Sequence, residues 1–196
     1  DVEIGRLQPL VGLALLEDDL FVLHLAVRTL ARVAKRSDRV EPDAGEGDDT
    51  VEIDDTNVLT SADGGDGDDT LSVDNALVAV VNAFTPAELA SFQAAFTNFE
   101  DLEVRNQLTN DIDVTDFGDI NSLILGGGAT TVMVDGLTTG GTLCLEGTST
   151  DITVNMTGAA TGPADELNFI MKSTGALAGG ILEAAGVESV NITTTD

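Results

Sequence analysis

The sequence of 196 residues predicts a mainly β protein, a right-handed parallel β-solenoid with an N-terminal helix and one inserted helix. Three observations lead to this prediction. Six of the eight basic residues lie within the first 40 residues, two glycine- and aspartate-rich nonapeptides lie 20 residues apart, and short apolar strands recur about every 20 residues after them. The order of these features along the chain also gives the order of the predicted elements.

The charge divides the chain into two domains. Residues 1–40 carry six basic and six acidic residues, whereas residues 41–196 carry two basic and 29 acidic ones, which accounts for the whole net charge of −27. A cluster of Pro, Gly and Asp begins at Glu41. We therefore expect an amphipathic helical segment over residues 1–40 and a β domain over residues 41–196.

The first domain is predicted to be a helix because its polar residues recur at helical spacing. They form one narrow stripe on an otherwise apolar segment, at Glu17, His24, Arg28, Arg32 and Lys35. Acidic residues at positions 17–19 argue against a membrane span. Two roles remain open. The helix could cap the apolar end of the solenoid, or the basic stripe within residues 10–36 could contact lipopolysaccharide or an anionic membrane surface.

The second domain opens with the most specific motif in the chain. Residues 64–72 fit the pattern G-G-x-G-x-D-x-U-x, where U is a large apolar residue, at every fixed position; residues 44–52 fit it with Ala44 in place of the first glycine. Glycines allow tight turns that point carbonyl oxygens inward, the aspartate adds a carboxylate, and the apolar residue begins a strand. The plainer alternative is a pair of solvated turns.

These nonapeptides resemble the repeats-in-toxin (RTX) family of secreted, calcium-binding parallel β-rolls. In that family, equivalent loops on successive turns hold Ca²⁺ between them. The resemblance implies Ca²⁺ as the cofactor and two carboxylate ligands, Asp49 and Asp69. It also implies carbonyl ligands from four glycines, which are Gly45, Gly47, Gly65 and Gly67.

Two series of short strands follow. Triplets of the first series begin at Leu102, Leu123, Leu143, Leu167 and Val190, and those of the second at Ile112, Val132 and Ile152. The second series follows the first at an offset of nine or ten residues. Two strands in each repeat of about 20 residues are typical of a parallel solenoid, in which the first residues of the first series would stack in one inward ladder. An antiparallel sandwich remains the alternative.

The inserted helix is predicted over about 86–97. Thr85-Pro86-Ala87-Glu88 forms a capping box with proline at the first helical position, and apolar residues follow at helical spacing. We expect this helix to pack over the edge of the strands.

A second, weaker resemblance covers residues 44–196. Segments 99–104 and 187–192 share the form apolar-Glu-x-apolar-x-apolar among strands rich in Thr, Asn and Gly, which is similar to the repeats of bacterial surface-layer (S-layer) proteins. The resemblance implies type I secretion, calcium-dependent folding outside the cell and self-association in a lattice at the cell surface. A chain that starts at Asp1 and ends within a strand-like repeat is expected to be a fragment.

Composition excludes several other functions. The acidic surface argues against nucleic acid as a partner, and one Cys and one His exclude thiolate clusters and histidine-rich metal sites. Cys144 is expected to face outward in an apolar patch with Ile124 rather than to act as a nucleophile. We therefore expect no enzyme but a calcium-binding structural segment. An RTX accessory module of a secreted enzyme and a β-solenoid enzyme acting on polysaccharide remain alternatives.

Overall fold

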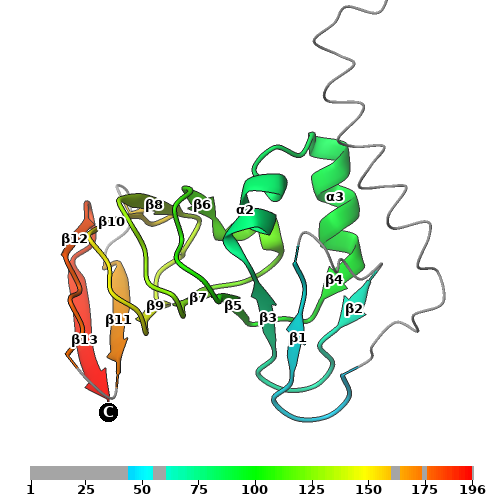
Figure 1. Cartoon of the computed structure of the whole chain (residues 1–196), viewed down its shortest axis with the longest axis horizontal. Helices are drawn as coiled ribbons and strands as arrows, with labels where there is room; N and C mark the ends of the chain where they lie inside the picture. Colours follow the sequence, from blue (N-terminus) through cyan, green and yellow to red (C-terminus); the bar gives the residue numbers. More distant parts are fainter. Residues whose placement is uncertain (1–43, 55–60, 160–163, 174–175, 196) are drawn as a thin grey trace, which may run out of the picture. The chain divides into compact units, whose positions relative to one another are not determined.

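The computed structural model describes residues 44–54, 61–159, 164–173 and 176–195 (Figure 1). The chain divides into two compact units, residues 1–38 and 39–196, and every described residue belongs to the second. The helix predicted within residues 1–40 therefore lies outside the described residues.

The described elements are mainly short strands, with two α-helices and one 3₁₀ turn. The bounds of the strands before the helices and of the helical elements are β1 Thr50–Glu52, β2 Ala62–Asp63, β3 Thr70–Val73, α2 Asn75–Val81, α3 Pro86–Ala95 and η1 Val114–Phe117. The remaining strands are β4 Phe96–Thr97, β5 Asp101–Val104, β6 Ile112–Asp113, β7 Ser122–Leu125, β8 Val132–Asp135, β9 Gly141–Leu145, β10 Asp151–Asn155, β11 Glu166–Lys172, β12 Ile181–Ala184 and β13 Ser189–Thr195.

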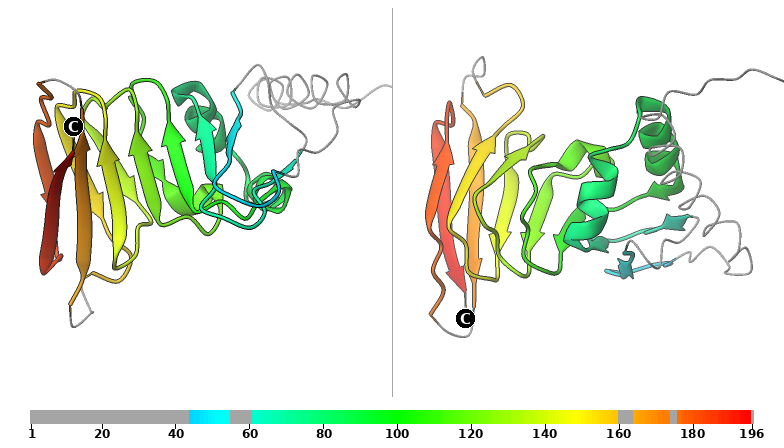
Figure 2. Two further views of the ribbon diagram at one scale, coloured as in Figure 1. Left: turned by 90° about the horizontal axis from the view of Figure 1, so that it is seen from below. Right: turned by 45° about the horizontal axis from the view of Figure 1, so that its top comes forward.

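The strands form parallel sheets. Seven strands pair in the order β1-β3-β5-β7-β9-β11-β13, four pair in the order β12-β10-β8-β6, and β2 pairs with β4. From β5 onward the chain alternates between the two larger sheets, and the strands of each sheet lie side by side in chain order (Figure 2). All described strand pairs are parallel, so the antiparallel alternative is wrong and the parallel arrangement is confirmed.

The predicted ladder pairs as expected from Leu102 to Leu143, and Leu167 pairs with Val190 as expected, but the step from Leu143 to Leu167 is wrong. Leu102 pairs with Leu123, and Leu123 pairs with Leu143. The next residue in the ladder is Phe169, because Leu167 pairs with Gly141 instead. Side chains along a strand alternate between its two faces, so this register shift of two residues keeps the same side chains facing inward. The hydrophobic pattern of the sequence therefore cannot distinguish the two registers.

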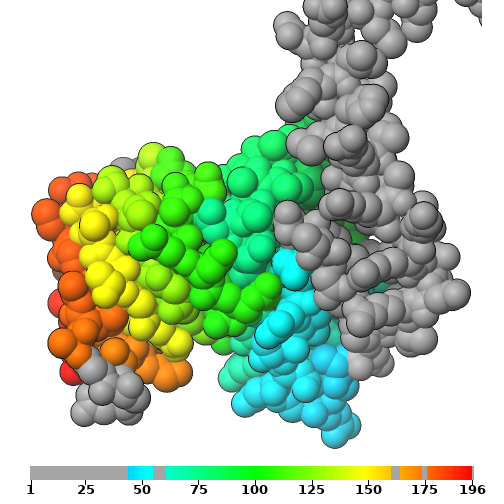
Figure 3. Space-filling model, viewed as in Figure 1, coloured from blue at the N-terminus to red at the C-terminus, as the bar shows by residue number. Residues whose placement is uncertain are grey.

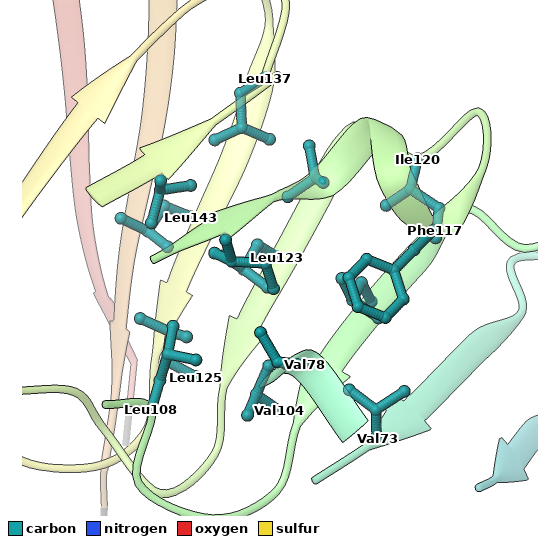
Figure 4. Close-up of a cluster of buried hydrophobic side chains, with 14 of the residues drawn as sticks. Val73, Val78, Val104, Leu108, Phe117, Ile120, Leu123, Leu125, Leu137 and Leu143 are labelled. Atoms are coloured by element: carbon teal, nitrogen blue, oxygen red, sulfur yellow. The ribbon is translucent and has the colours of Figure 1, made fainter. Parts of the chain in front are cut away.

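The inward side chains form one continuous hydrophobic core. In Figure 4, Leu123 and Leu143 lie next to each other, and Leu125 and Val104 extend the same cluster. The side chains of all four are fully buried, and each buried leucine contributes roughly 2 kcal/mol through the apolar area it removes from water. The packed ladders thus hold the loops at the strand ends in fixed positions.

Between β3 and β4 the structure has two helices, where the sequence predicted one. The capping box of α3 is formed as expected, since the Thr85 N–H donates to Glu88 Oε2 at 2.8 Å and the Glu88 N–H donates to Thr85 Oγ1 at 3.4 Å. α2 was not predicted, because its valine-rich sequence is typical of a strand. It forms because Asp74 Oδ1 accepts from the Leu77 N–H at 2.8 Å and because one face of the helix is buried.

The second strand series also differs at its first member. The triplet that begins at Ile112 was predicted as a strand, but β6 ends at Asp113 and Val114 begins η1. Asp113 Oδ1 accepts from the Thr115 N–H at 3.0 Å and so caps this turn. The other two members form strands as predicted, in β8 and β10.

Candidate metal centre

The two nonapeptide loops lie directly on one another. Glu46 and Asp66 form a parallel β-bridge, and the strands that follow pair Thr50 with Thr70. Within the loops, the Gly47 N–H donates to Asp66 O at 2.7 Å and the Asp66 N–H donates to Gly45 O at 3.0 Å. The spacing of 20 residues therefore places Gly45 against Gly65, Gly47 against Gly67, and Asp49 against Asp69. The cyan segment in Figure 3 contains the first loop.

The glycines at positions 65 and 67 of the second loop are required by both conformation and space. Gly65 has a φ of +99° and Gly67 a φ of +157°, values that side chains rarely adopt. A Cβ at Gly65 would lie 2.1 Å from Gly45 O, and one at Gly67 would lie 2.4 Å from Gly47 O. The carbonyl oxygens of the first loop thus point at the backbone of the second. Gly45 O already accepts one hydrogen bond, and a carbonyl oxygen has a second lone pair for a cation.

Asp69 is the innermost acidic residue of the site. Its side chain is fully buried, and its Oδ1 accepts from the Asp49 N–H of the preceding loop at 2.8 Å. Its Oδ2 is buried and has no hydrogen-bond partner among the residues that the structure describes. A buried carboxylate oxygen without a partner is costly unless a proton or a cation satisfies it.

A third layer, formed by residues 97–101, packs against the second nonapeptide loop and Asp69. The Asp69 N–H donates to Glu100 Oε2 at 2.8 Å, and Asp69 O accepts from the Glu100 and Asp101 N–H groups at 3.1 and 3.0 Å. Glu100 was not predicted from the sequence to take part in this site. The sequence does carry one signal for Glu100. It is the glutamate of segment 99–104, which shares the form apolar-Glu-x-apolar-x-apolar with segment 187–192.

The remaining acidic residues of the loops are more exposed. Asp49 is partly buried, and its carbonyl oxygen accepts from the Thr70 N–H at 2.8 Å. Asp48 is exposed and its Oδ1 accepts from the Asp68 N–H at 3.1 Å. In the described part of the chain, the one ion pair within 4.0 Å joins Lys172 and Glu146. No described Lys or Arg side chain is therefore paired with the carboxylates of the two loops.

The predicted ligands fit a hard cation rather than a transition metal. Within the described ranges, no three His, Cys, Asp or Glu side chains are grouped so that they could hold a metal ion. A metal in the stacked loops would therefore need backbone carbonyls in addition to Asp49 and Asp69. Ca²⁺ accepts such mixed shells of roughly six to eight oxygen atoms in flexible geometry, whereas Mg²⁺ demands a near-ideal octahedron.

Cys144 lies on the opposite face of the strand from the ladder. It pairs with Ile124 and Ile170 on the neighbouring strands and its side chain is buried. Burial raises the pKa of the Cys144 thiol, and the carboxylate of Glu146 raises it further. A thiol of this kind stays protonated at neutral pH, as expected for a residue of an apolar patch.

Comparison with known proteins provides no further assignment, since no family model, curated protein or solved structure matches this chain. In the segments that the structure describes, no helix is long and apolar enough to cross a membrane.

Proposed function

We propose that this chain is a calcium-binding structural segment of a secreted bacterial protein of the surface-layer type. In this proposal, residues 41–196 form a right-handed parallel β-solenoid, or β-roll, that folds when it meets Ca²⁺ outside the cell. The observation that carries the proposal is the buried Oδ2 of Asp69, in the second of the two stacked glycine-rich loops, which has no hydrogen-bond partner among the described residues.

A cation explains this oxygen better than a proton does. A protonated Asp69 would gain an O–H donor, which would itself need an acceptor in the same buried space. A divalent cation satisfies the oxygen directly and also reduces the repulsion among the neighbouring acidic side chains. The carbonyl oxygens of Gly45 and Gly47, which point at the second loop, would supply further ligands of the kind that Ca²⁺ accepts.

The sheet arrangement supports the structural part of the proposal. The chain alternates between two parallel sheets from β5 to β13, as it does in a solenoid. At the end of that array, Ile181 of β12 and Ile192 of β13 expose 59% and 66% of their surface. Exposed apolar side chains on outermost strands favour contact with further apolar surface.

Calcium titration calorimetry on two matched variants tests the metal site. Asp69→Asn removes the buried carboxylate, whereas Asp68→Asn removes the same charge from an exposed residue of the same loop. We expect Asp69→Asn to weaken Ca²⁺ binding at least about tenfold and Asp68→Asn to weaken it by less than about threefold. Equal effects of the two variants would mean that Ca²⁺ only screens the charge of the loop, and the proposed site would be wrong.

A further inference from the structure

The hydrogen bonds that hold Asp69 recur at Asp165, near the other end of the seven-stranded sheet. The Asp165 N–H donates to Glu188 Oε2 at 2.7 Å, and Asp165 O accepts from the Glu188 and Ser189 N–H groups at 3.1 and 3.0 Å. The corresponding distances at Asp69 are 2.8, 3.1 and 3.0 Å. Each aspartate immediately precedes a strand, β3 or β11, and each glutamate precedes the neighbouring strand, β5 or β13.

Each of the two aspartates also has one carboxylate oxygen, Oδ2, that is buried and accepts no hydrogen bond from the described residues. Asp165 exposes only 7% of its surface, and among the described residues its buried Oδ2 has no hydrogen-bond partner, as is also true of the Oδ2 of Asp69. Among the described residues, the buried side-chain oxygens and nitrogens that lack a partner are these two and Ser61 Oγ. Two of these three atoms therefore lie at equivalent positions of one repeated arrangement, which indicates a shared requirement.

No side chain in the described segments supplies what the Oδ2 of Asp165 lacks. Lys172 is paired with Glu146, and the hydrogen bonds of Arg105 go to backbone and side-chain oxygens of residues 53 and 72. Protonation of Asp165 would add a buried donor that also needs an acceptor. The partner residue, Glu188, is exposed, so an ion from solvent can reach its carboxylate.

We propose that Asp165 and Glu188 form a second site for a hard divalent cation, and that this ion is Ca²⁺. Two carboxylates are too few for a transition-metal cluster but suit a cation that completes its shell with backbone oxygens and water. The sequence around Asp165 does not contain the nonapeptide, so this site extends calcium binding beyond the motif. The choice of Ca²⁺ rests on the proposed function, whereas the existence of a cation site rests on Asp165 alone.

Equilibrium dialysis of the full chain against radioactive Ca²⁺ tests this site. We expect Asp165→Asn to lower the number of bound ions by about one, and Glu188→Gln to weaken one class of sites at least about tenfold. Glu183→Gln is the matched control, because Glu183 is an exposed glutamate on the adjacent β12. It should bind Ca²⁺ like the unaltered chain.

Unchanged stoichiometry and affinity in both Asp165→Asn and Glu188→Gln would overturn the proposal. If Asp165→Asn does not fold, Glu188→Gln decides, because its exposed amide oxygen can still accept from the Asp165 N–H. Asp69→Asn in the same assay separates the two sites. A loss with Asp165→Asn but not with Asp69→Asn would refute the nonapeptide site and support this one, and the reverse result would do the opposite.

Discussion

At the scale of single residues, Gly64 shows how tightly the third layer packs on the second nonapeptide loop. Its N–H donates to Thr97 O at 3.0 Å, and a Cβ at this position would lie 1.8 Å from Asn98 O and 2.8 Å from Asp69 Oδ2. Asn98 O belongs to the backbone, so it cannot move away without displacing the chain. The first glycine of the motif thus provides space beside the buried carboxylate.

Gly64→Ala should therefore destabilise the fold by roughly 2–3 kcal/mol, because the methyl group overpacks the contact with Asn98 O. It should also weaken Ca²⁺ binding, because the Asp69 carboxylate must shift. Urea unfolding and calcium titration measure the two effects.

Gly140→Ala is the control for Gly64→Ala. Gly140 has a φ of +80°, but no atom lies within 4 Å of the position that a Cβ would take there, so alanine meets strain without a clash. We expect it to cost about 1 kcal/mol and to leave Ca²⁺ binding unchanged. A Gly64→Ala protein that is as stable as Gly140→Ala and binds Ca²⁺ normally would contradict the packing described here.

The sequence identified Asp69 as a candidate ligand but gave no signal for Asp165. Asp69 belongs to a motif whose fixed positions identify it, whereas Asp165 precedes β11 without flanking glycines of the same pattern. Its burial and its bonds to Glu188 depend on the pairing of β11 with β13, which is a property of the folded sheet. The shared form of segments 99–104 and 187–192 was visible in the sequence, but the hydrogen bonds that its glutamates accept from Asp69 and Asp165 were not predicted from it.

At the scale of elements, local signals identified the helix that carries its own cap. α3 begins at Pro86, as the capping box predicted, and ends at Ala95, near the predicted end. α2 has a polar cap at Asp74 but a valine-rich body, so burial of Leu77, Val78 and Val81 decides its conformation. The register between β9 and β11 could likewise not be predicted from the local sequence, because two registers that differ by two residues both keep the apolar side chains inward.

The capping box of α3 gives a pH-dependent prediction. The backbone and side-chain hydrogen bonds from Thr85 hold the pKa of Glu88 below its ordinary value of 4.5. A carboxylate with a lowered pKa stabilises the folded state above its unfolded pKa, and this contribution is lost as the pH falls through the folded pKa. Glu88→Ala should therefore lower the melting temperature at pH 7, and the difference from the unaltered protein should shrink below about pH 4.

Circular dichroism melts at several pH values measure this difference. Thr85→Ala should cost about 1 kcal/mol at pH 7, because it removes the other half of the box. Glu88→Gln serves as the control, since its amide oxygen can still accept from the Thr85 N–H. A Glu88→Ala deficit that is the same at pH 7 and pH 3 would show that the carboxylate charge does not matter.

At the scale of the whole molecule, the net charge of −27 opposes folding. The two stacked loops bring Asp48, Asp66 and Asp68 close to the buried Asp69, and charges within one Debye length, about 8 Å at physiological salt, are poorly screened. An ion bound between the loops would offset this repulsion and join segments that are 20 residues apart in sequence. In that case the free energy of Ca²⁺ binding adds to the free energy of folding.

The melting temperature should therefore rise with free Ca²⁺ far more than with NaCl at equal ionic strength, because salt screens charge without occupying a site. Mg²⁺ should substitute poorly, since carbonyl-rich loops do not provide its octahedral geometry. Asp69→Asn should remove most of the calcium-dependent rise, whereas Asp68→Asn should retain it. A melting temperature that is indifferent to a chelator would defeat this coupling and leave the nonapeptides as turns that stack through their hydrogen bonds alone.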